Sequence, residues 1–282
     1  MPTVSAVIAT YNRAADLAVS LPKLYDQTRP PDELVIVDDG STDNTATLIN
    51  ERFPQATYLR LPTNQGLIAA RNHGIRKAKG DYILSLDDDC WFLNEAALAS
   101  ALNQTAAAAI LTFNLLLPNG TRTYPENAPP FHSPTFLGGA SLLHRASVIA
   151  AGLYPESFRC FGEESDLALR LYDAGHSILT LPAITVYHAQ SPANRSEHRT
   201  RFYTHRNAVL TDLLRCPTPY LPLALPRTWA ANTLYNLKQG YWTTDLELSL
   251  TLPGLLKIAA THRHPVTRQT YRNWRRLRAS SF

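Results

Sequence analysis

Cysteine is scarce in this chain of 282 residues: three are present, and none is part of a CxxC pair. This pattern predicts neither a disulfide framework nor a cysteine-held zinc site, and it fits a reducing compartment. Long apolar runs are scarce too. Polar residues such as Ser100 and Asn103 interrupt the most apolar segment, 96–117, so we expect no membrane-spanning helix. The chain opens on a strand pattern rather than on a basic and apolar leader, so we expect a cytoplasmic protein.

Two glycine-rich phosphate-binding fingerprints are also missing. G-x-G-x-x-G does not follow the first expected strand, and G-x-x-x-x-G-K-[ST] does not occur there either. Both absences argue against a dinucleotide-dependent dehydrogenase and a P-loop NTPase. Charge is close to balance except at the end, where residues 261–282 hold six arginines and no acid. That tail could be a solvated helix end, or a contact with nucleic acid or a membrane surface.

Strand and helix signals alternate through the first third of the chain. Short apolar and β-branched runs are separated by longer segments with helical character. This β-α-β-α-β-α-β order predicts a parallel sheet covered by helices. The expected strands are 4–10, 34–37, 57–61 and 82–86, and the expected helices are 14–27, 43–53 and 66–78.

The rest of the chain is less regular. Residues 118–135 are rich in Pro, Asn, Gly and Thr and indicate a long loop of the kind that borders binding sites. We expect a helix over 164–174 and a pair of strands over 178–188, interrupted by Pro182. Prolines at 217, 219, 222 and 226 mark a change of organisation. They predict a first domain over 1–216 and a helical, basic extension over 217–282.

Acidic residues gather where two of the expected strands end. Asp38 and Asp39 follow one strand, and Asp87, Asp88 and Asp89 follow another. The carboxyl ends of parallel strands meet at one edge of a sheet, where α/β proteins bind ligands. Adjacent carboxylates repel one another, and a hard divalent cation would supply the missing positive charge. The alternative for each cluster is a polar turn that ends a strand.

Six short motifs resemble those of family 2 glycosyltransferases, which have the GT-A fold. Each motif is weak alone, but the ordered set is specific. They are VIATYNR at 7–13, VIVDDGSTD at 35–43, NQG at 64–66 with ARNHG at 70–74, DYILSLDDD at 81–89, FGEESDL at 161–167 and VYH at 186–188. The resemblance implies an α/β fold with a mostly parallel central sheet flanked by helices. It also implies inverting transfer of a sugar from a nucleoside diphosphate sugar to an acceptor hydroxyl.

By this resemblance, one group of residues would bind the donor. Tyr11 would pack against the nucleotide base, and Asp39 would accept from the imino N–H of uracil or thymine. Arg71 would reach the diphosphate, whose oxygens match a guanidinium. Asp87 and Asp88 would contact the ribose and the hydrated metal. The alternatives are a core aromatic at Tyr11 and a surface arginine at Arg71. The rest of this group is Ala9, Thr10, Arg13 and Gly66.

The resemblance also implies a metal site and a base. Asp89 would be the firmest metal ligand and His188 a second one, for Mn²⁺ or Mg²⁺, with the imidazole favouring Mn²⁺. A structural histidine is the alternative for His188. Glu164 would act as general base, although many relatives carry aspartate there. Acids in a first helical turn also favour the helix dipole without any function. The residues expected to orient the site or the acceptor are Gly139, Glu163 and Asp166.

The implied substrates follow from the same family. We expect a UDP or dTDP sugar rather than a GDP sugar as donor, and a glycan or polyprenyl-linked acceptor in bacterial cell-surface polysaccharide synthesis. The Q-x-x-R-W motif of the processive synthases is absent, which favours single addition. Residues 205–207 (HRN) resemble a region of rhamnosyltransferase-like members. The rivals are a non-catalytic nucleotide-sugar-binding module and a sugar nucleotidyltransferase, although the G-x-G-T-R loop of the latter is missing.

The basic tail has a helical pattern of its own. Arg268, Arg272 and Arg275 follow i, i+4, i+7 spacing, with Tyr271 and Trp274 between them. Basic residues with interleaved aromatics predict peripheral contact with an anionic membrane, here the inner face of the cell membrane. A solvated helix packed against the main domain is the alternative. Because no nucleic-acid motif accompanies the pattern, we expect no nucleic-acid partner.

Overall fold

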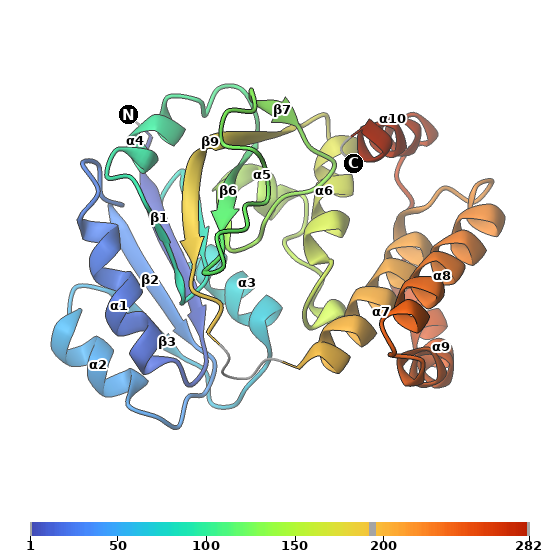
Figure 1. The fold of residues 1–282 in the computed structure, drawn as a ribbon, viewed down its shortest axis with the longest axis horizontal. Helices are drawn as coiled ribbons and strands as arrows, with labels where there is room; N and C mark the ends of the chain where they lie inside the picture. The colour runs from blue at the N-terminus through green and yellow to red at the C-terminus, as the bar shows by residue number, and fades with distance from the viewer. Residues whose placement is uncertain (1, 192–195, 281–282) are drawn as a thin grey trace.

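The computed structural model describes residues 2–191 and 196–280. Figure 1 shows a large sheet with helices packed around it and a further group of helices to one side. Within the described residues the sheet has nine strands in the order β3-β2-β1-β4-β8-β6-β9-β5, with β7 paired to β9. The predicted central sheet flanked by helices, with a helical C-terminal region, is therefore confirmed.

The first third of the chain follows the predicted alternation, with each boundary within two residues of its expected place. β1 pairs in parallel with β2 and β4, and β2 pairs in parallel with β3. The carboxyl ends of these strands therefore share one edge of the sheet. The elements are β1 (Val4–Thr10), α1 (Ala14–Tyr25), β2 (Glu33–Asp38), α2 (Thr45–Arg52), β3 (Thr57–Arg60), α3 (Leu67–Lys77) and β4 (Tyr82–Leu86).

From β4 onward the sheet becomes mixed. β8 lies antiparallel between β4 and β6, while β6 and β9 are parallel. The following elements are β5 (Cys90–Phe92), α4 (Ala97–Leu102), β6 (Ile110–Leu116), β7 (Phe131–His132), β8 (Ala140–His144), α5 (Arg145–Ala150), a 3₁₀ turn (Glu156–Phe158), α6 (Glu163–Asp173) and β9 (Ile178–His188). The predicted helix over 164–174 corresponds to α6, and the predicted loop over 118–135 contains the two-residue strand β7.

The predicted pair of strands over 178–188 is wrong, because β9 is a single strand. Its register against β6 shifts between Phe113 and Asn114, whose partners are Leu181 and Thr185. Pro182 falls inside this irregularity. A bulge releases the backbone from regular ladder pairing, so a residue without an N–H is tolerated there.

The core forms two clusters on opposite sides of the sheet. Val7 belongs to one cluster and Ala6 and Ile8 to the other, because successive side chains of a strand point to opposite faces. Ile68 of α3 packs in the first cluster and Leu17 of α1 in the second. All seven residues of β1 are buried, as expected for a central strand covered on both faces.

Four helices complete the described chain: α7 (Glu197–Arg215), α8 (Leu221–Lys238), α9 (Thr243–His262) and α10 (Arg268–Ser280). Leu210 of α7 and Leu248 of α9 share a core cluster with Leu167 of α6. The predicted boundary near residue 216 falls between α7 and α8 and stays a prediction. Among the residues described, no helix is long and apolar enough to cross a bilayer.

The basic tail forms α10, as its spacing predicts, but its aromatic residues do not face solvent. Tyr271 and Trp274 are each 5% exposed, and Trp274 Nε1 donates a 2.7 Å hydrogen bond to the carbonyl of Pro134. The expectation that these rings would be available to a membrane is therefore wrong. They fix α10 to the rest of the protein, and the arginines are left on its outer side.

Candidate active site

The three aspartates after β4 occupy a turn at the carboxyl edge of the sheet. The N–H of Cys90 donates to the carbonyl of Asp87 at 3.1 Å, which closes the turn before β5. The three side chains have different surroundings. The Asp87 carboxylate is 32% exposed, whereas Asp88 and Asp89 are buried. The turn therefore presents one accessible carboxylate and keeps two close to the core.

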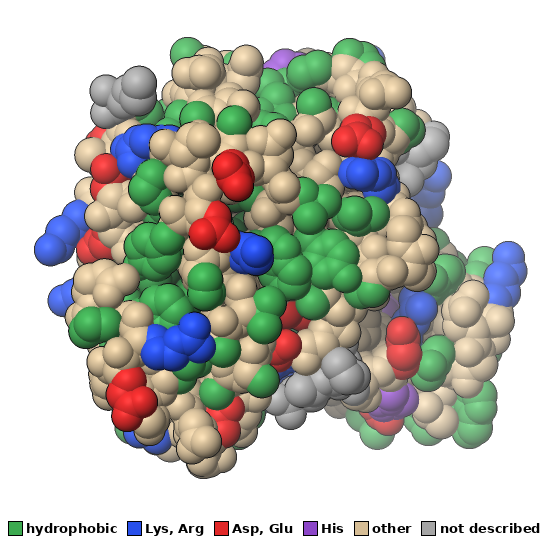
Figure 2. All heavy atoms as spheres, turned by 60° about the vertical axis from the view of Figure 1, so that its left-hand side comes forward, with side chains coloured by type: hydrophobic (Ala, Val, Ile, Leu, Met, Phe, Trp, Pro, Cys, Tyr) green, Lys and Arg blue, Asp and Glu red, His purple; other side chains and the backbone are tan. Residues whose placement is uncertain are grey.

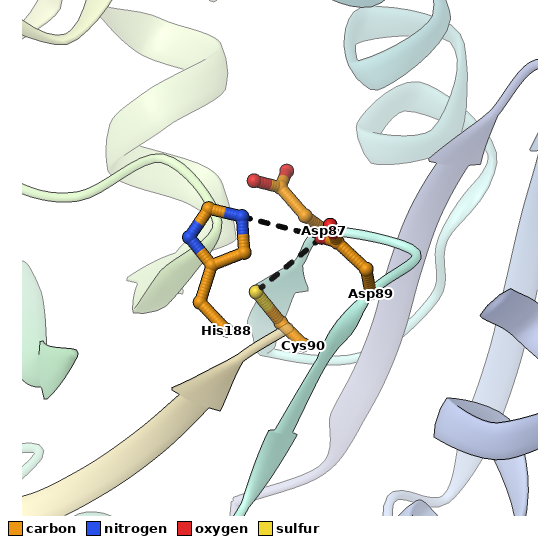
Figure 3. Close-up of side chains that lie close together, drawn as sticks. All are labelled: Asp87, Asp89, Cys90 and His188. Carbon is orange, nitrogen blue, oxygen red and sulfur yellow. Dashed lines mark hydrogen bonds and ion pairs between the residues drawn. The ribbon is translucent and has the colours of Figure 1, made fainter. Parts of the chain in front are cut away.

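Asp89 lies at the centre of a cluster of possible ligands. Cys90 in β5 is opposite His188 in β9, so the strand register brings both to the aspartate turn. His188 Nε2 lies 3.4 Å from Asp89 Oδ1, and Cys90 Sγ lies 3.9 Å from the same oxygen. Figure 3 shows both side chains directed at the Asp89 carboxylate. One ligand atom from each of Asp87, Asp89, Cys90 and His188 lies within 4.8 Å of the other three.

This donor set fits a divalent cation that prefers oxygen. Two carboxylates and an imidazole suit Mn²⁺ and Mg²⁺. Cys90 is a poor ligand for a hard cation, because its sulfur is a soft donor. In the metal-free site, burial raises the pKa of its thiol well above the ordinary value, and neighbouring Asp87 adds to the effect. The carboxylate of Asp89 also accepts from the N–H of Ser191 at 3.0 Å, which helps to orient it.

Thr10 and Arg13 support the aspartate turn from the end of β1. Thr10 Oγ1 donates to Asp88 Oδ2 at 2.9 Å, and the Arg13 guanidinium lies 4.0 Å from Asp89 Oδ2. Burial raises the pKa of Asp88 to about 7, although Arg13 opposes the shift. Asp88 therefore has its contacts within the protein, beneath the exposed Asp87.

Arg71 connects the aspartate turn to the start of α6. Its guanidinium lies 2.5 Å from Asp87 Oδ1 and 3.3 Å from Glu163 Oε1. The side chain is only 4% exposed, so the surface-arginine alternative is wrong. A charged group this deeply buried requires such partners, because an unpaired one would be strongly destabilising.

Two glycines before β8 bring the backbone close to these charged groups. A Cβ on Gly138 would lie 2.5 Å from Glu164 Oε1 and 2.7 Å from Arg71 Nη1. A Cβ on Gly139 would overlap the Asp87 carboxylate. Residues 138 and 139 therefore form a wall of the site that any larger residue would disturb.

The predicted acidic pair lies at the first turn of α6. Glu163 is 1% exposed and Glu164 is half-buried. Desolvation raises the pKa of both carboxyls, and Arg71 opposes this shift. Oε2 of Glu163 is buried and has no hydrogen-bond partner within the described residues. Neighbouring carboxyls with raised pKa values are a common feature of functional sites.

Asp39 joins the end of β2 to the start of α3. Its carboxylate accepts from the N–H groups of Gln65 at 2.7 Å and Gly66 at 2.8 Å, and burial raises its pKa. Gly66 has a φ of 96°, which favours glycine. The N–H of Asp39 donates to the carbonyl of Thr10 at 2.8 Å, so the end of β1 lies alongside. Tyr11, half-buried, directly follows β1, and Ala9 is buried within it.

Asp166 lies apart from this group. It is fully buried, and its carboxylate contacts Arg170 at 2.7 Å and Arg215 at 2.6 Å. The pair with Arg170 lies within α6, and the pair with Arg215 joins α6 to the C-terminal end of α7. The geometry favours a structural role for Asp166 over the predicted role in orienting the acceptor.

Sequence reasoning missed two contributors to the site. Cys90 directly follows Asp89 in the sequence, and the pairing of β5 with β9 places it opposite His188, a contact that local sequence does not reveal. Asn207 in α7 is buried, and its Nδ2 donates to the carbonyls of Phe158, Cys160 and Phe161 at 3.0, 2.7 and 2.7 Å. It thereby fixes the loop that leads into α6. The sequence also predicts a loop over 189–200 that, with the loop over 118–135, decides the donor sugar, acceptor and linkage; its residues 192–195 lie outside the described residues.

The sequence and the fold agree with one family. The model of glycosyl transferase family 2 matches residues 5–146, about half of the chain. This chain belongs to glycosyl transferase family 2, as its motifs predict.

Curated relatives support this assignment. An uncharacterized glycosyltransferase of Haemophilus influenzae is 39% identical over 98 residues, which cover 34% of this chain and 39% of that protein. The putative glycosyltransferase EpsE of Bacillus subtilis is 26% identical over 273 residues, covering 85% of this chain and 97% of that one. The chain spans only part of several curated relatives. In three of them, two uncharacterized glycosyltransferases of Haemophilus influenzae and the hyaluronan synthase of Pasteurella multocida, the matched segment covers 39%, 31% and 27% of the relative's own length.

Solved structures share the fold. The mannosyltransferase PcManGT from Pyrobaculum calidifontis, in complex with GDP-Man and Mn²⁺, has a TM-score of 0.60 at 20% identity, covering 99% of this chain and 85% of that one. TarS of S. aureus, in complex with UDP-GlcNAc, has a TM-score of 0.63 at 18% identity, covering 86% of this chain and 79% of that one. The predicted GT-A fold is therefore confirmed.

Proposed function

We propose that this protein is an inverting, metal-dependent glycosyltransferase that moves a sugar from a nucleoside diphosphate sugar to an acceptor hydroxyl. One observation carries the proposal: Arg71 contacts both Asp87 of the aspartate turn and Glu163 of the acidic pair. A cationic group for the departing diphosphate and a carboxylate for the attacking hydroxyl thus belong to one site. Direct displacement at the anomeric carbon needs both groups together.

The nucleotide would lie along the carboxyl ends of β1, β2 and β4. Each oxygen of Asp39 accepts one backbone hydrogen bond and keeps further acceptor capacity. The imino N–H of uracil or thymine could use that capacity, which favours UDP or dTDP over GDP. Tyr11 would pack against the base. The structural relatives were solved with a UDP sugar in one case and a GDP sugar in the other, so nucleotide choice belongs to the proposal.

Asp89 and His188 would hold the divalent cation, with Asp87 beside them. A bound Mn²⁺ or Mg²⁺ would neutralise charge on the diphosphate. Arg71 would add a second cationic contact. Because two carboxylates already orient its guanidinium, it needs little reorganisation when negative charge grows on the leaving group.

Glu164 would take the proton of the acceptor hydroxyl. A pKa raised by desolvation brings a carboxylate closer to the working pH of a general base. Glu163 would bind rather than react: one oxygen pairs with Arg71, and the other is buried without a partner in the described part of the chain. A hydroxyl of the donor sugar or of the acceptor would satisfy that oxygen.

The acceptor would be a glycan or a polyprenyl-linked glycan of a bacterial cell-surface polysaccharide. Support comes from a relative in Bacillus subtilis, the putative teichuronic acid biosynthesis glycosyltransferase TuaG, which is 30% identical over 126 residues. The proposal includes single addition of the sugar.

The test is an assay of the purified protein with UDP, dTDP and GDP sugars in Mn²⁺, with release of nucleoside diphosphate as the readout. The proposal predicts release that Glu164→Gln suppresses. Donor binding without hydrolysis or transfer to any acceptor would instead indicate a binding module. Formation of a sugar nucleotide from a sugar phosphate and a nucleoside triphosphate would indicate a nucleotidyltransferase.

A further inference from the structure

A groove of about 300 Å³ lies between α8 and α10. It is separate from the candidate active site. α6 begins at that site with Glu163, and near its other end Asp173 accepts from the N–H of Thr267, just before α10, at 2.8 Å. Tyr271 of the groove shares a buried cluster with Leu169, in the second half of α6, so the groove lies toward the end of that helix away from Glu163. The groove is lined by Tyr220, Leu223, Ala224, Arg227, Tyr271, Arg272, Arg275 and Arg276.

The charge of this groove is of one sign. Four of its eight lining residues are arginines and none is acidic. Arg272 donates to Gln269 at 2.9 Å, but none of the four forms an ion pair with a carboxylate in residues 2–191 and 196–280. The nearby Asp212 acts on Arg275 only through space and accepts from Thr228 at 2.5 Å. One half-buried carboxylate leaves most of the positive charge of the four arginines uncompensated.

The remaining lining is apolar. The rings of Tyr220 and Tyr271 stack with centroids 5.8 Å apart and planes at 15°, and Ala224 is buried beside them. Leu223, in contrast, is 78% exposed at the edge of the groove. The floor of the groove is therefore aromatic, and Leu223 at its edge is an apolar side chain exposed to solvent.

α8 continues this apolar character away from the groove. Leu234 and Leu237 are exposed, and they follow Leu223 at i+11 and i+14, so all three share one helical face. On α9, Leu246 and Leu250 are exposed one turn apart. Exposed apolar side chains gathered on neighbouring helices are typical of an interaction surface. By contrast, Figure 2 shows acidic and basic side chains interspersed on the face around α1 and α2.

We propose that the α8–α10 groove binds the headgroup phosphate of an anionic phospholipid and docks the protein on an anionic bilayer. Guanidinium groups match phosphate oxygens bidentately, and the exposed leucines of α8 would enter the boundary between headgroups and acyl chains. The apolar part of the contact thus comes from α8 and not from the buried aromatics of α10.

Two other occupants match the surface less well. A two-fold contact between copies of this chain would cover the leucines but bring two sets of four arginines together. A nucleic acid would match the arginines and leave the leucines in water. Of these three occupants, an anionic bilayer is the one that complements both the arginines and the leucines, and it is the occupant that the test addresses.

The test is sedimentation of the full chain with vesicles of phosphatidylglycerol and phosphatidylcholine, compared with phosphatidylcholine alone. We expect binding to the anionic vesicles only, weakened by salt. The triple variant Arg227→Gln, Arg275→Gln, Arg276→Gln should bind about 10²-fold more weakly, which is the loss expected from about 1 kcal/mol for each of three basic side chains at a charged membrane surface. Leu223→Gln should also weaken binding while the net charge stays unchanged.

A matched control removes the same charge elsewhere. Arg52→Gln, Lys77→Gln, Lys79→Gln changes three exposed basic residues far from the groove in sequence and should bind as the unmodified chain does. Both triple variants should keep the melting temperature and the transferase rate measured with soluble substrates. Equal losses in the two triple variants, binding to neutral vesicles, or no binding at all would overturn the proposal. So would a dimer in sedimentation velocity that Leu223→Gln disrupts while vesicle binding stays intact.

Discussion

The guanidinium of Arg71 lies 2.5 Å from the carboxylate of Asp87. On its other side it lies 3.3 Å from Glu163. α3 supplies the arginine, the turn after β4 supplies Asp87, and α6 supplies Glu163, so three distant segments meet at one buried positive charge. This arrangement joins the groups proposed to hold the donor to those proposed to activate the acceptor.

Arg71→Lys tests that connection. Lysine keeps the charge but cannot bridge two carboxylates with a planar fork, so we expect a fall in kcat/KM of about 10² with the fold retained. Arg71→Ala should in addition lower the free energy of unfolding by about 3–5 kcal/mol, because it leaves the buried Glu163 without its partner. Kinetics and urea unfolding measure the two effects. A lysine variant with unchanged kinetics would contradict the assignment.

Glu164→Gln keeps the shape of the side chain and removes its basicity. We expect kcat to fall by about 10²–10⁴ while donor affinity stays unchanged. Because desolvation raises the pKa of Glu164 and a base acts when deprotonated, kcat of the unmodified protein should rise with pH through a pKa above the ordinary value of 4.5. The rise of kcat with pH through this pKa should be absent in Glu164→Gln. A far larger loss of kcat in Glu163→Gln or Asp166→Asn would mean that the base has been misassigned.

Metal dependence follows from the cluster around Asp89. EDTA should abolish transfer, and Mn²⁺ or Mg²⁺ should restore it. Asp89→Ala should remove both activity and Mn²⁺ binding measured by titration calorimetry. Cys90→Ser is the matched control within the same cluster: sulfur is a soft donor that suits neither Mn²⁺ nor Mg²⁺, so metal affinity should persist. Full activity in chelator would rule out the metal site.

Local sequence sufficed for much of the fold. The alternation up to β4 is visible because β1, β2 and β4 are buried on both faces and the helices between the strands have their own periodicity. Pro182 led to the wrong prediction of two strands over 178–188. A bulge in the pairing with β6 keeps β9 continuous, and local sequence does not show this pairing. The antiparallel β8 was likewise not predicted, since strand direction within a sheet depends on contacts between distant segments.

In the candidate site too, some features can be predicted from local sequence and others depend on contacts between distant segments. Asp87, Asp89 and Glu164 carry motif signals and could be named from the sequence. The position of Cys90 opposite His188 follows from strand register, and the tertiary contacts of Asn207 span more than 40 residues. For α10, the period of Tyr271 and Trp274 gives a helix but not the direction of its apolar face. The same spacing would allow Trp274 to face a membrane or, as the structure shows, to face the protein and donate to the carbonyl of Pro134.

A substitution of Asp166 can distinguish a structural role of this residue from a role in orienting the acceptor. Asp166→Asn should lower the free energy of unfolding by about 3 kcal/mol, because Arg170 and Arg215 would lose their buried carboxylate. Its kcat at a temperature where it is folded should stay within about tenfold of normal, as expected for a residue that does not touch substrate. Asp26→Asn breaks an exposed pair with Lys23 and should cost under about 1 kcal/mol. A strong fall in kcat at unchanged stability would restore the acceptor-orienting role.

Asn207 should act as a positioning residue for the base. Its amide donates to three carbonyls of the loop before α6, where Arg159 and Phe161 have φ values of 64° and 63°. Such backbone costs about 1–3 kcal/mol per residue and persists only when surrounding contacts impose it. Asn207→Ala removes these contacts, so the first turn of α6 should shift. We expect kcat to fall about tenfold or more while KM for the donor stays near normal.

The control for Asn207 lies one turn further along α7. Thr211 Oγ1 donates to the carbonyl of Asn207 at 2.8 Å, so Thr211→Val removes one buried hydrogen bond without touching the loop. It should cost about 1 kcal/mol of stability and leave kcat unchanged. Asn207→Asp cannot donate to the three carbonyls and should resemble Asn207→Ala in kcat. If both Asn207 variants lose stability but keep kcat, Asn207 supports the fold alone and α6 does not depend on it for the placement of Glu164.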